Sequence, residues 1–153
     1  MAILAGQRIR ALDFAGYASD FDFSNLTDLA PADGQFETGS PVFGVAFMAP
    51  SSGAVKCDFG GRLRVTSGAV RGVLACQLRT GAVINSGVLV EDADADRGVE
   101  MGATNGGEAS SYRIHTGLTP GDLYHFVMVH SRASTGGTIN VIARYIAVSP
   151  WHE

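Results

Sequence analysis

The feature that most constrains this chain is an alternation of apolar and polar residues, with a period of two, that begins near residue 39 and continues almost to residue 148. Such a period places successive side chains on opposite faces of a strand, whereas a helix requires a period near 3.6. Turn residues interrupt the alternation every eight to twelve positions, which is the spacing of a β-sandwich or barrel. The pattern therefore predicts an all-β fold.

The predicted strands lie at 42–48, 54–59, 62–66, 70–78, 82–90, 111–116, 123–130 and 138–148, with a polar excursion at 91–109. We expect a bulge or bend at Gly60 and Gly61. A late turn at 118–121, followed by two long strands, favours a jelly-roll-type β-sandwich. A closed eight-stranded barrel is the main alternative.

Residues 1–38 lack this period and read as an extended N-terminal arm, which leaves residues 39–153 as the β-sandwich domain. The arm carries scattered apolar side chains without a repeat of their own. We expect it to lie either on its own domain or on a neighbouring subunit. The interface residues predicted in the arm are Ile9, Leu12, Phe14, Tyr17, Phe21 and Phe23.

The predicted strand 123–130 is apolar on both faces, with Leu123, Val127 and Val129 on one and Tyr124, Phe126 and Met128 on the other. A strand of this kind is covered on both sides, which favours an oligomer. Tyr124, Phe126 and Met128 are accordingly predicted interface residues. Trp151 either plugs one end of the sandwich or anchors an interface.

Charge and hydropathy exclude two classes of partner. With 11 basic and 15 acidic residues the net charge is −4, so no field attracts a phosphate backbone and nucleic acid is excluded as the main partner. No apolar run approaches the roughly 18 residues that span a bilayer. The first seven residues do not form a signal segment, so we expect the protein to be made in the cytosol and to remain soluble there.

The acidic run at 91–98 resembles part of a calcium loop, because its D-x-D-x-D spacing matches the first three ligands. Gly98 lies one place too late, however, and Ala103 stands where a closing glutamate belongs. We therefore expect a solvated acidic loop and no cofactor. His125 and His130 lie five apart on one predicted strand and so point to opposite faces. Together with His115 and His152, they are expected at a strand rim or subunit contact rather than at a metal.

The chain has no G-x-S-x-G elbow, and its glycine pairs do not form a phosphate-binding loop. We therefore expect no enzymatic activity. Cys57 and Cys76 are the two cysteines. They are either two buried thiols, which a reducing cytoplasm favours, or a disulfide.

Three segments resemble a group of actinobacteriophage and prophage virion proteins. They are AGQRIRA at 5–11 with Asp13 and Phe14, GSPVFGVAF at 39–47 with Ala49 and Pro50, and GLTPG at 117–121 with Leu123 and Tyr124. Members of this group look like minor tail, tail-fibre or capsid-decoration proteins with a jelly-roll domain similar to the C1q and tumour-necrosis-factor fold, often trimeric. The resemblance implies no catalytic motif.

The leading hypothesis is a phage virion structural protein, a minor tail or tail-fibre component that forms a trimeric β knob and docks on other virion subunits through its arm. A capsid-decoration or head-fibre protein is the first alternative. A glycan-binding module that recognises the host surface is the second, suggested by Tyr112, Tyr124 and the acidic run at 91–96. An enzyme acting on cell-wall polymers would need paired carboxylates in a cleft, and the sequence offers only clustered loop acids.

Overall fold

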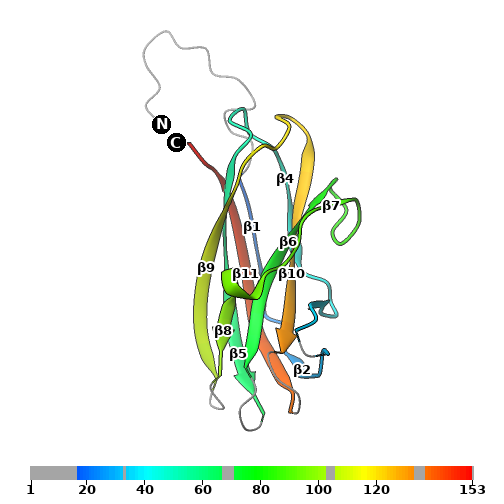
Figure 1. Cartoon of the computed structure of the whole chain (residues 1–153), viewed down its shortest axis with the longest axis vertical. Coiled ribbons are helices and arrows are strands. Elements are labelled where there is room, and N and C mark those ends of the chain that lie inside the picture. Colours follow the sequence, from blue (N-terminus) through cyan, green and yellow to red (C-terminus); the bar gives the residue numbers. More distant parts are fainter. Residues whose placement is uncertain (1–16, 33, 67–70, 103–105, 133–136, 153) are drawn as a thin grey trace.

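The computed structural model describes residues 17–32, 34–66, 71–102, 106–132 and 137–152. Figure 1 shows an elongated sandwich of two antiparallel β-sheets. Within these residues the strands are β1 (Ala18–Asp22), β2 (Leu26–Leu29), β3 (Glu37–Thr38), β4 (Gly44–Met48), β5 (Val55–Val65), β6 (Gly72–Thr80), β7 (Leu89–Glu91), β8 (Val99–Met101), β9 (Gly107–His115), β10 (Leu123–Arg132) and β11 (Ile139–Pro150). A short 3₁₀ turn, η2 (Ala95–Arg97), precedes β8. The all-β prediction is confirmed.

The strands pair in a nested order that identifies the jelly roll. In sheet A, β1 and β2 pair with β11, which pairs with β5, which pairs with β9. In sheet B, β3 and β4 pair with β10, which pairs with β6, which pairs with β7 and β8. The outermost strands in sequence thus pair with each other, as do the successive inner ones, which is a long hairpin rolled into two sheets. The two sheets remain separate, so the structure favours the sandwich over the closed barrel.

The predicted alternation places the core. In β5 the side chains of Cys57, Phe59, Leu63 and Val65 are buried, whereas those of Arg62 and Arg64 are exposed. The same parity buries Phe43, Val45 and Phe47 along β4 and the segment that precedes it. These side chains form one apolar layer between the sheets.

The expected bulge at Gly60 and Gly61 is absent, because β5 runs unbroken from Val55 to Val65. The irregularity lies instead in β11, between Val141 and Ala143. The two glycines serve close approach: a Cβ on Gly60 would lie 2.8 Å from the Tyr145 ring, and one on Gly61 would lie 2.9 Å from Cδ1 of Leu74. Each glycine therefore leaves space for a side chain that packs across it.

The described part of the predicted arm, residues 17–32 and 34–38, lies against the sandwich. Residues 17–38 supply β1 and β2 at the edge of sheet A and β3 at the edge of sheet B. The segment therefore lies on its own domain, one of the two surfaces considered, and it lies there as paired strands. Ile9, Leu12 and Phe14 fall outside the described residues.

The two apolar faces of β10 are both covered within one chain, which corrects the inference drawn from them. Tyr124, Phe126 and Met128 point into the core between the sheets. These three side chains are buried there and do not form a surface that a partner could contact. An oligomer would therefore have other residues at its interface.

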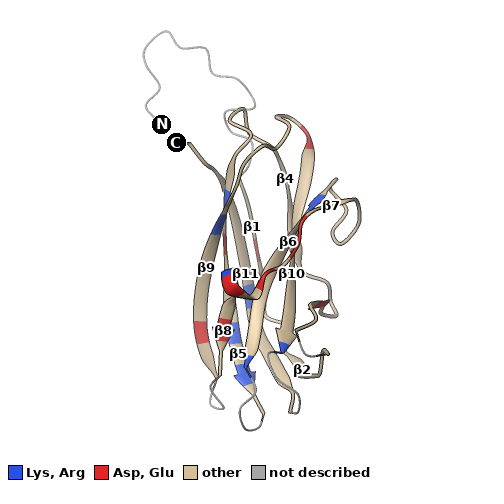
Figure 2. Cartoon of the chain, in the orientation of Figure 1, with Lys and Arg blue, Asp and Glu red and all other residues tan. Residues whose placement is uncertain are grey.

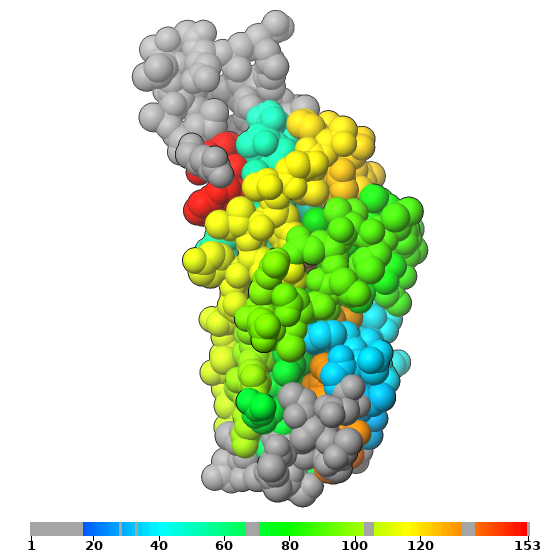
Figure 3. Space-filling model, in the orientation of Figure 1, coloured from blue at the N-terminus to red at the C-terminus, as the bar shows by residue number. Residues whose placement is uncertain are grey.

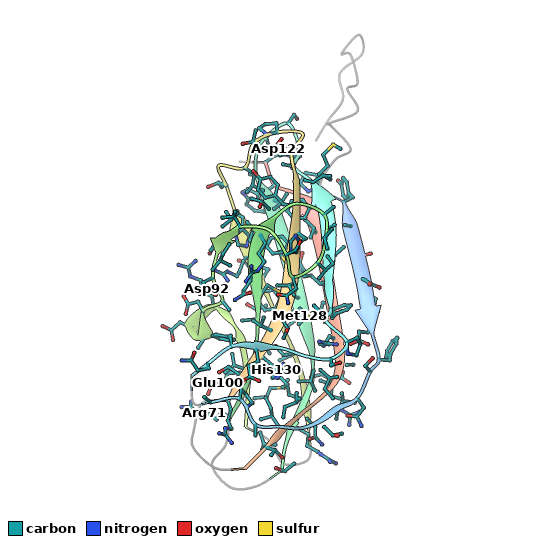
Figure 4. All side chains as sticks on the ribbon, turned by 90° about the vertical axis from the view of Figure 1, so that its right-hand side faces the viewer. Arg71, Asp92, Glu100, Asp122, Met128 and His130 are labelled. Carbon is teal, nitrogen blue, oxygen red and sulfur yellow. The ribbon has the colours of Figure 1, made fainter. Side chains whose placement is uncertain are left out.

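The opposite face of β10 is covered by two excursions of the chain. The loop at 81–88 folds back over sheet B, where Nδ1 of His125 lies 2.8 Å from the carbonyl oxygen of Gly81 and Ile84 approaches Gly44. The residues after β2 lie across β10 (Figure 3), where the amide of Gly34 donates to the carbonyl of Arg132. Figure 4 views the molecule from this side, with Met128 and His130 on β10 behind these segments. Val127 and Val129 are buried as a result.

The strand predicted at 82–90 is mostly a loop. Only Leu89–Glu91 pairs, with Leu78 and Arg79 of β6, and Val83 and Val88 are each 70% exposed. Most of the apolar run that was predicted as a strand therefore belongs to the 81–88 loop that covers sheet B. Among the described residues, no helix has both the length and the apolar character needed to cross a membrane.

The core account predicts a large penalty for truncating Phe126, which is fully buried and stacks 5.3 Å from the Phe47 ring centroid. We expect Phe126→Ala to lower the free energy of unfolding by about 3–5 kcal/mol, because truncation leaves a cavity. Urea unfolding followed by tryptophan fluorescence measures it. Val83→Ala, at an exposed position, is the control and should change the value by less than about 0.5 kcal/mol. Equal effects of the two substitutions would contradict the described core.

Candidate functional site

A sandwich has two open sides, where an edge strand of one sheet lies beside an edge strand of the other. Here β1 contacts β4 on one side and β9 contacts β8 on the other. We call these sides the β1–β4 seam and the β8–β9 seam. A buried arginine lies at each seam, Arg144 at the first and Arg113 at the second, and each forms an ion pair there.

At the β8–β9 seam, Glu91 forms ion pairs with Arg113 and Arg97, and Nδ1 of His115 lies within hydrogen-bond distance of its carboxylate. Nη1 of Arg113 also donates to the carbonyl oxygens of Cys76, at 3.2 Å, and Asp92, at 3.4 Å. One guanidinium thus joins β9 of sheet A to β6 of sheet B and to the segment after β7. Figure 2 shows acidic and basic residues gathered around η2 at this place.

His115 could be taken for a general base oriented by Glu91, but its surroundings do not support chemistry. Its ring packs 4.9 Å from the ring of Phe126, and Nε2 is buried without a hydrogen-bond partner in the described part of the chain. Burial lowers the pKa of His115 below its usual value, although the Glu91 carboxylate opposes this. A base must reach the proton that it abstracts, and Nε2 faces no solvent.

At the β1–β4 seam, Arg144 forms an ion pair with Asp22. Its Nη2 donates to the carbonyl oxygen of Pro41 at 3.0 Å, and its guanidinium carbon lies 5.1 Å from the centroid of the Phe43 ring. Burial acts to raise the pKa of Asp22. Hydrogen bonds from Ser24 and the Arg144 guanidinium outweigh that effect and hold the pKa below its usual value. The carboxylate therefore stays ionised beside the arginine.

The acidic run at 91–98 is occupied by structural contacts. Beyond the ion pairs of Glu91, Asp92 accepts a hydrogen bond from the Gln77 amide at 2.8 Å, and Asp94 accepts one from the backbone of Asp96 at 3.0 Å. Asp94 also lies 3.4 Å from Arg97. In the described ranges no cluster of His, Cys, Asp or Glu is arranged to hold a metal ion.

The outer face of sheet A is different, because it exposes aromatic rings. Phe23 stacks on Phe21 at 6.2 Å between ring centroids, and Phe21 stacks on Tyr145 at 5.7 Å. Phe21 and Phe23 are 63% and 80% exposed. The alternation of β1, β9 and β11 places Tyr17 and Tyr112 on the same side of the sheet. We call these five rings, Tyr17, Phe21, Phe23, Tyr112 and Tyr145, the aromatic face.

A groove of about 460 Å³ runs beside the stacked rings. Gly61 of β5 also lines it, together with the polar side chains of Arg62, Glu108 and Ser110. Arg62 and Glu108 are register partners on β5 and β9. Within the described part of the chain, neither forms an ion pair. The groove thus combines an apolar wall with polar groups that have capacity to bind a solute.

A second hollow continues along the same face, between Tyr17 and Ser19 of the N-terminal edge and Asp58 of β5. Beyond it the Lys56 ammonium lies 4.9 Å from the centroid of the Tyr112 ring and 2.6 Å from the Asp58 carboxylate. This surface charge is internally paired. The aromatic face thus has rings on the β1, β11 and β9 side of sheet A, with polar side chains of β5 between Tyr145 and Tyr112.

The predicted interface residues separate into three groups. Tyr17, Phe21 and Phe23 lie on the aromatic face, whereas Tyr124, Phe126 and Met128 lie in the core. Trp151 is half-buried just after β11, where its amide donates to the carbonyl of Ala54 at 2.9 Å and it lines a small hollow with Ser52 and Thr116. It covers one end of the sandwich. His125 and His130 point to opposite faces of β10, as predicted, and both are buried.

Sequence reasoning missed the residues that complete the groove. Tyr145 follows the outward parity of β11, so the alternation alone could have placed it on the surface. Arg62, Glu108 and Ser110 gave no such signal, because their proximity depends on the pairing of β5 with β9.

Comparison with known proteins adds little to this geometry. No family model matches the chain, and no curated protein does. Among solved structures, dimeric latent PorU from Porphyromonas gingivalis aligns over 98% of this chain with 16% sequence identity and a TM-score of 0.37. The alignment spans 14% of the length of that chain.

The buried histidine beside the β1–β4 seam predicts a loss of stability in acid. Burial and the Arg144 charge lower the pKa of His130 to about 4, against about 6.5 in an unfolded chain. Between these values the unfolded state binds the proton and the folded state does not. The stabilisation is therefore complete above pH 6.5 and is lost as the pH falls toward 4.

We expect the free energy of unfolding to fall by about 2–3 kcal/mol from this residue between pH 7 and pH 4. Urea titrations at several pH values give the free energy of unfolding of the wild type and of His130→Gln. The slopes of these two free energies against pH are then compared. The variant should show a shallower pH dependence, and the exposed control His152→Gln should match the wild type. Parallel curves for His130→Gln and the wild type would exclude a neutral buried His130.

Proposed function

We propose that this chain is a structural, non-catalytic subunit of a bacteriophage particle, made in the host cytoplasm and incorporated into the tail or a tail fibre. Two observations support the proposal. The segments at 5–11, 39–47 and 117–121 resemble phage virion proteins, and the fold is the jelly roll that this resemblance implies. The ionisable groups of both seams form ion pairs and hydrogen bonds that hold the sheets together.

The observation that carries the mode of action is the aromatic face. Phe21 and Phe23 expose most of their surface on a chain whose opposite sheet is covered by its own loops. Exposed aromatic patches of this kind mark interaction sites, and aromatic rings supply much of the binding energy of interfaces. We propose that copies of this chain associate as a homotrimer through this face.

In such a trimer each aromatic face would contact a different surface of the next copy, since threefold contacts are heterologous. On this face Lys56 and Asp58 neutralise each other, so this pair adds no net charge to the contact. Other virion subunits would contact the remaining surface, with the N-terminal residues as the docking element. A position on the capsid, as decoration or head fibre, is the alternative within the same class.

Association through the aromatic face predicts a specific loss of assembly. Light scattering after size exclusion, at micromolar concentration, should give three times the chain mass of 16.0 kDa for the wild type. Phe21→Ser combined with Phe23→Ser should shift the protein to monomer, because the exposed rings no longer contribute apolar area.

Val83→Ser combined with Val88→Ser is the matched control, because these side chains are equally apolar and equally exposed on the other sheet. It should remain trimeric. Circular dichroism must show that both double variants are folded. A monomeric wild type, or equal dissociation of the two variants, would refute the proposal.

A second candidate function, recognition of a host surface glycan, is favoured by one observation. The groove on sheet A places Tyr145 and Phe21 opposite Arg62, Glu108 and Ser110, and sugars are held by stacking on rings together with hydrogen bonds to polar side chains. Two residues that first suggested this function do not serve it, because Tyr124 is buried and Glu91 is engaged at the β8–β9 seam.

Glycan recognition predicts retention of the protein on an array of host cell-wall oligosaccharides. Tyr145→Ala should weaken that retention about tenfold, which corresponds to about 1.4 kcal/mol of stacking. Val83→Ala should leave it unchanged. Absence of binding to every oligosaccharide, or undiminished binding by Tyr145→Ala, would remove this candidate.

A further inference from the structure

The two cysteines occupy equivalent places in the two sheets. Cys57 lies on β5 of sheet A and Cys76 on β6 of sheet B, both with buried side chains in the core layer. Both are free thiols in the structure. β5 and β6 follow each other in the chain and lie at the centre of their sheets, so the two strands face each other across the sandwich.

Small residues let these two strands approach closely. Gly61 of β5 faces Leu74 of β6, where a Cβ would come within 2.9 Å of the leucine Cδ1. Gly72 of β6 faces Leu63 of β5, where a Cβ would come within 3.1 Å of the leucine Cδ2. In this register the next inward residues are Phe59 of β5 and Cys76 of β6, and Cys57 is the inward residue of β5 that follows Phe59.

A hydrogen bond between the sheets lies next to both cysteines. Arg113 is the register partner of Cys57 on β9, and its Nη1 donates to the carbonyl oxygen of Cys76 at 3.2 Å. The register partner of Cys57 is therefore hydrogen-bonded to the backbone of Cys76.

The environment of the thiols agrees with this geometry. Burial first, and then the adjacent Cys76 side chain, with which Cys57 hydrogen-bonds, raise the pKa of the Cys57 thiol well above its usual value. A protonated thiol is a poor nucleophile. The pair therefore stays reduced while the sandwich is closed and becomes reactive when the sheets separate.

We propose that Cys57 and Cys76 form a disulfide that joins the two sheets when the chain meets a small disulfide oxidant such as glutathione disulfide. One cysteine thiolate attacks a sulfur of the oxidant and releases one glutathione thiol, leaving a mixed disulfide. The second cysteine thiolate then attacks the protein sulfur of that mixed disulfide and releases the second glutathione thiol. Two protein thiols are oxidised, one oxidant disulfide is reduced, and the two protons leave on the released thiols.

The link would close a loop of about 20 residues that contains the connection between the sheets, and it would restrict the unfolded chain accordingly. It would also fix β5 against β6 at the point where Arg113 already joins them. This inference depends on the packing of the two strands and not on the proposed phage function.

The test uses the full chain, opened reversibly in dilute urea with a mixture of reduced and oxidised glutathione, and then returned to buffer. We expect no free thiol after denaturation in the presence of a thiol reagent, an intact mass lower by two hydrogens, and a Cys57–Cys76 peptide that disappears on reduction. The midpoint of thermal unfolding should rise by roughly 5–10 °C. Reduction should return it to the original value.

Cys57→Ala and Cys76→Ala serve as matched controls, because each keeps one thiol in the same core and cannot form the link. Neither should gain thermal stability under oxidation. A wild type that keeps two thiols, stops at a glutathione adduct, or links only between chains would overturn the proposal. An internal link that lowers the unfolding midpoint would overturn it as well, because the native packing would then oppose the bond.

Discussion

The jelly roll of this chain depends on how its two open sides are closed. Two sheets can bury an apolar layer between them, but the sides of that layer remain open to water unless other groups cover them. Arg144 and Arg113 do this on opposite sides, each paired with a carboxylate. Arg113 also donates to the Cys76 carbonyl of sheet B, and Arg144 to the Pro41 carbonyl in the segment before β4. A guanidinium suits the task because it has five donors in a fixed plane and stays charged. Replacing the acidic partner of either arginine would leave a buried charge unpaired and would strongly destabilise the fold.

This use of charge decides which surface remains for binding. The acidic segment after β7 looked like a cation site, yet its carboxylates bind Arg113, Arg97 and Gln77. The outer face of sheet B is covered by the 81–88 loop and by the residues after β2. The outer face of sheet A has no such cover in the described part of the chain. The aromatic face and its groove are therefore where a partner would gain most from contact.

The sequence predicted the elements that depend on local alternation. β4, β6, β10 and β11 lie close to where the period of two placed them, because a strand with one buried face must alternate. β5 joins two predicted strands, and β9 begins at Gly107, inside the predicted polar excursion. β1, β2 and β3 were missed because they are short edge strands rich in Asp, Ser and Thr, whose pairing with β10 and β11 provides what their own pattern lacks. The run at 82–90 was predicted as a strand because it is apolar, but most of it is a loop. Its apolar residues belong to a loop that covers another strand.

Other features could not be read from the sequence because they join residues distant along the chain. Asp22 and Arg144 meet only once β1 pairs with β11, and the groove requires Arg62 and Glu108 to pair across β5 and β9. The apolar pattern of β10 showed correctly that both its faces are covered. It did not show whether the covering atoms belong to the same chain, and Ile84 and the Gly81 carbonyl supply part of that answer here.

Hydroxyl-radical footprinting of the protein at low and high concentration tests the role of the aromatic face most directly. The account predicts that oxidation of Phe21 and Tyr145 falls as copies associate, while oxidation of Val83 and Val88 stays constant. Unchanged reactivity of Phe21 and Tyr145, with protection confined to the 81–88 loop or absent altogether, would contradict it.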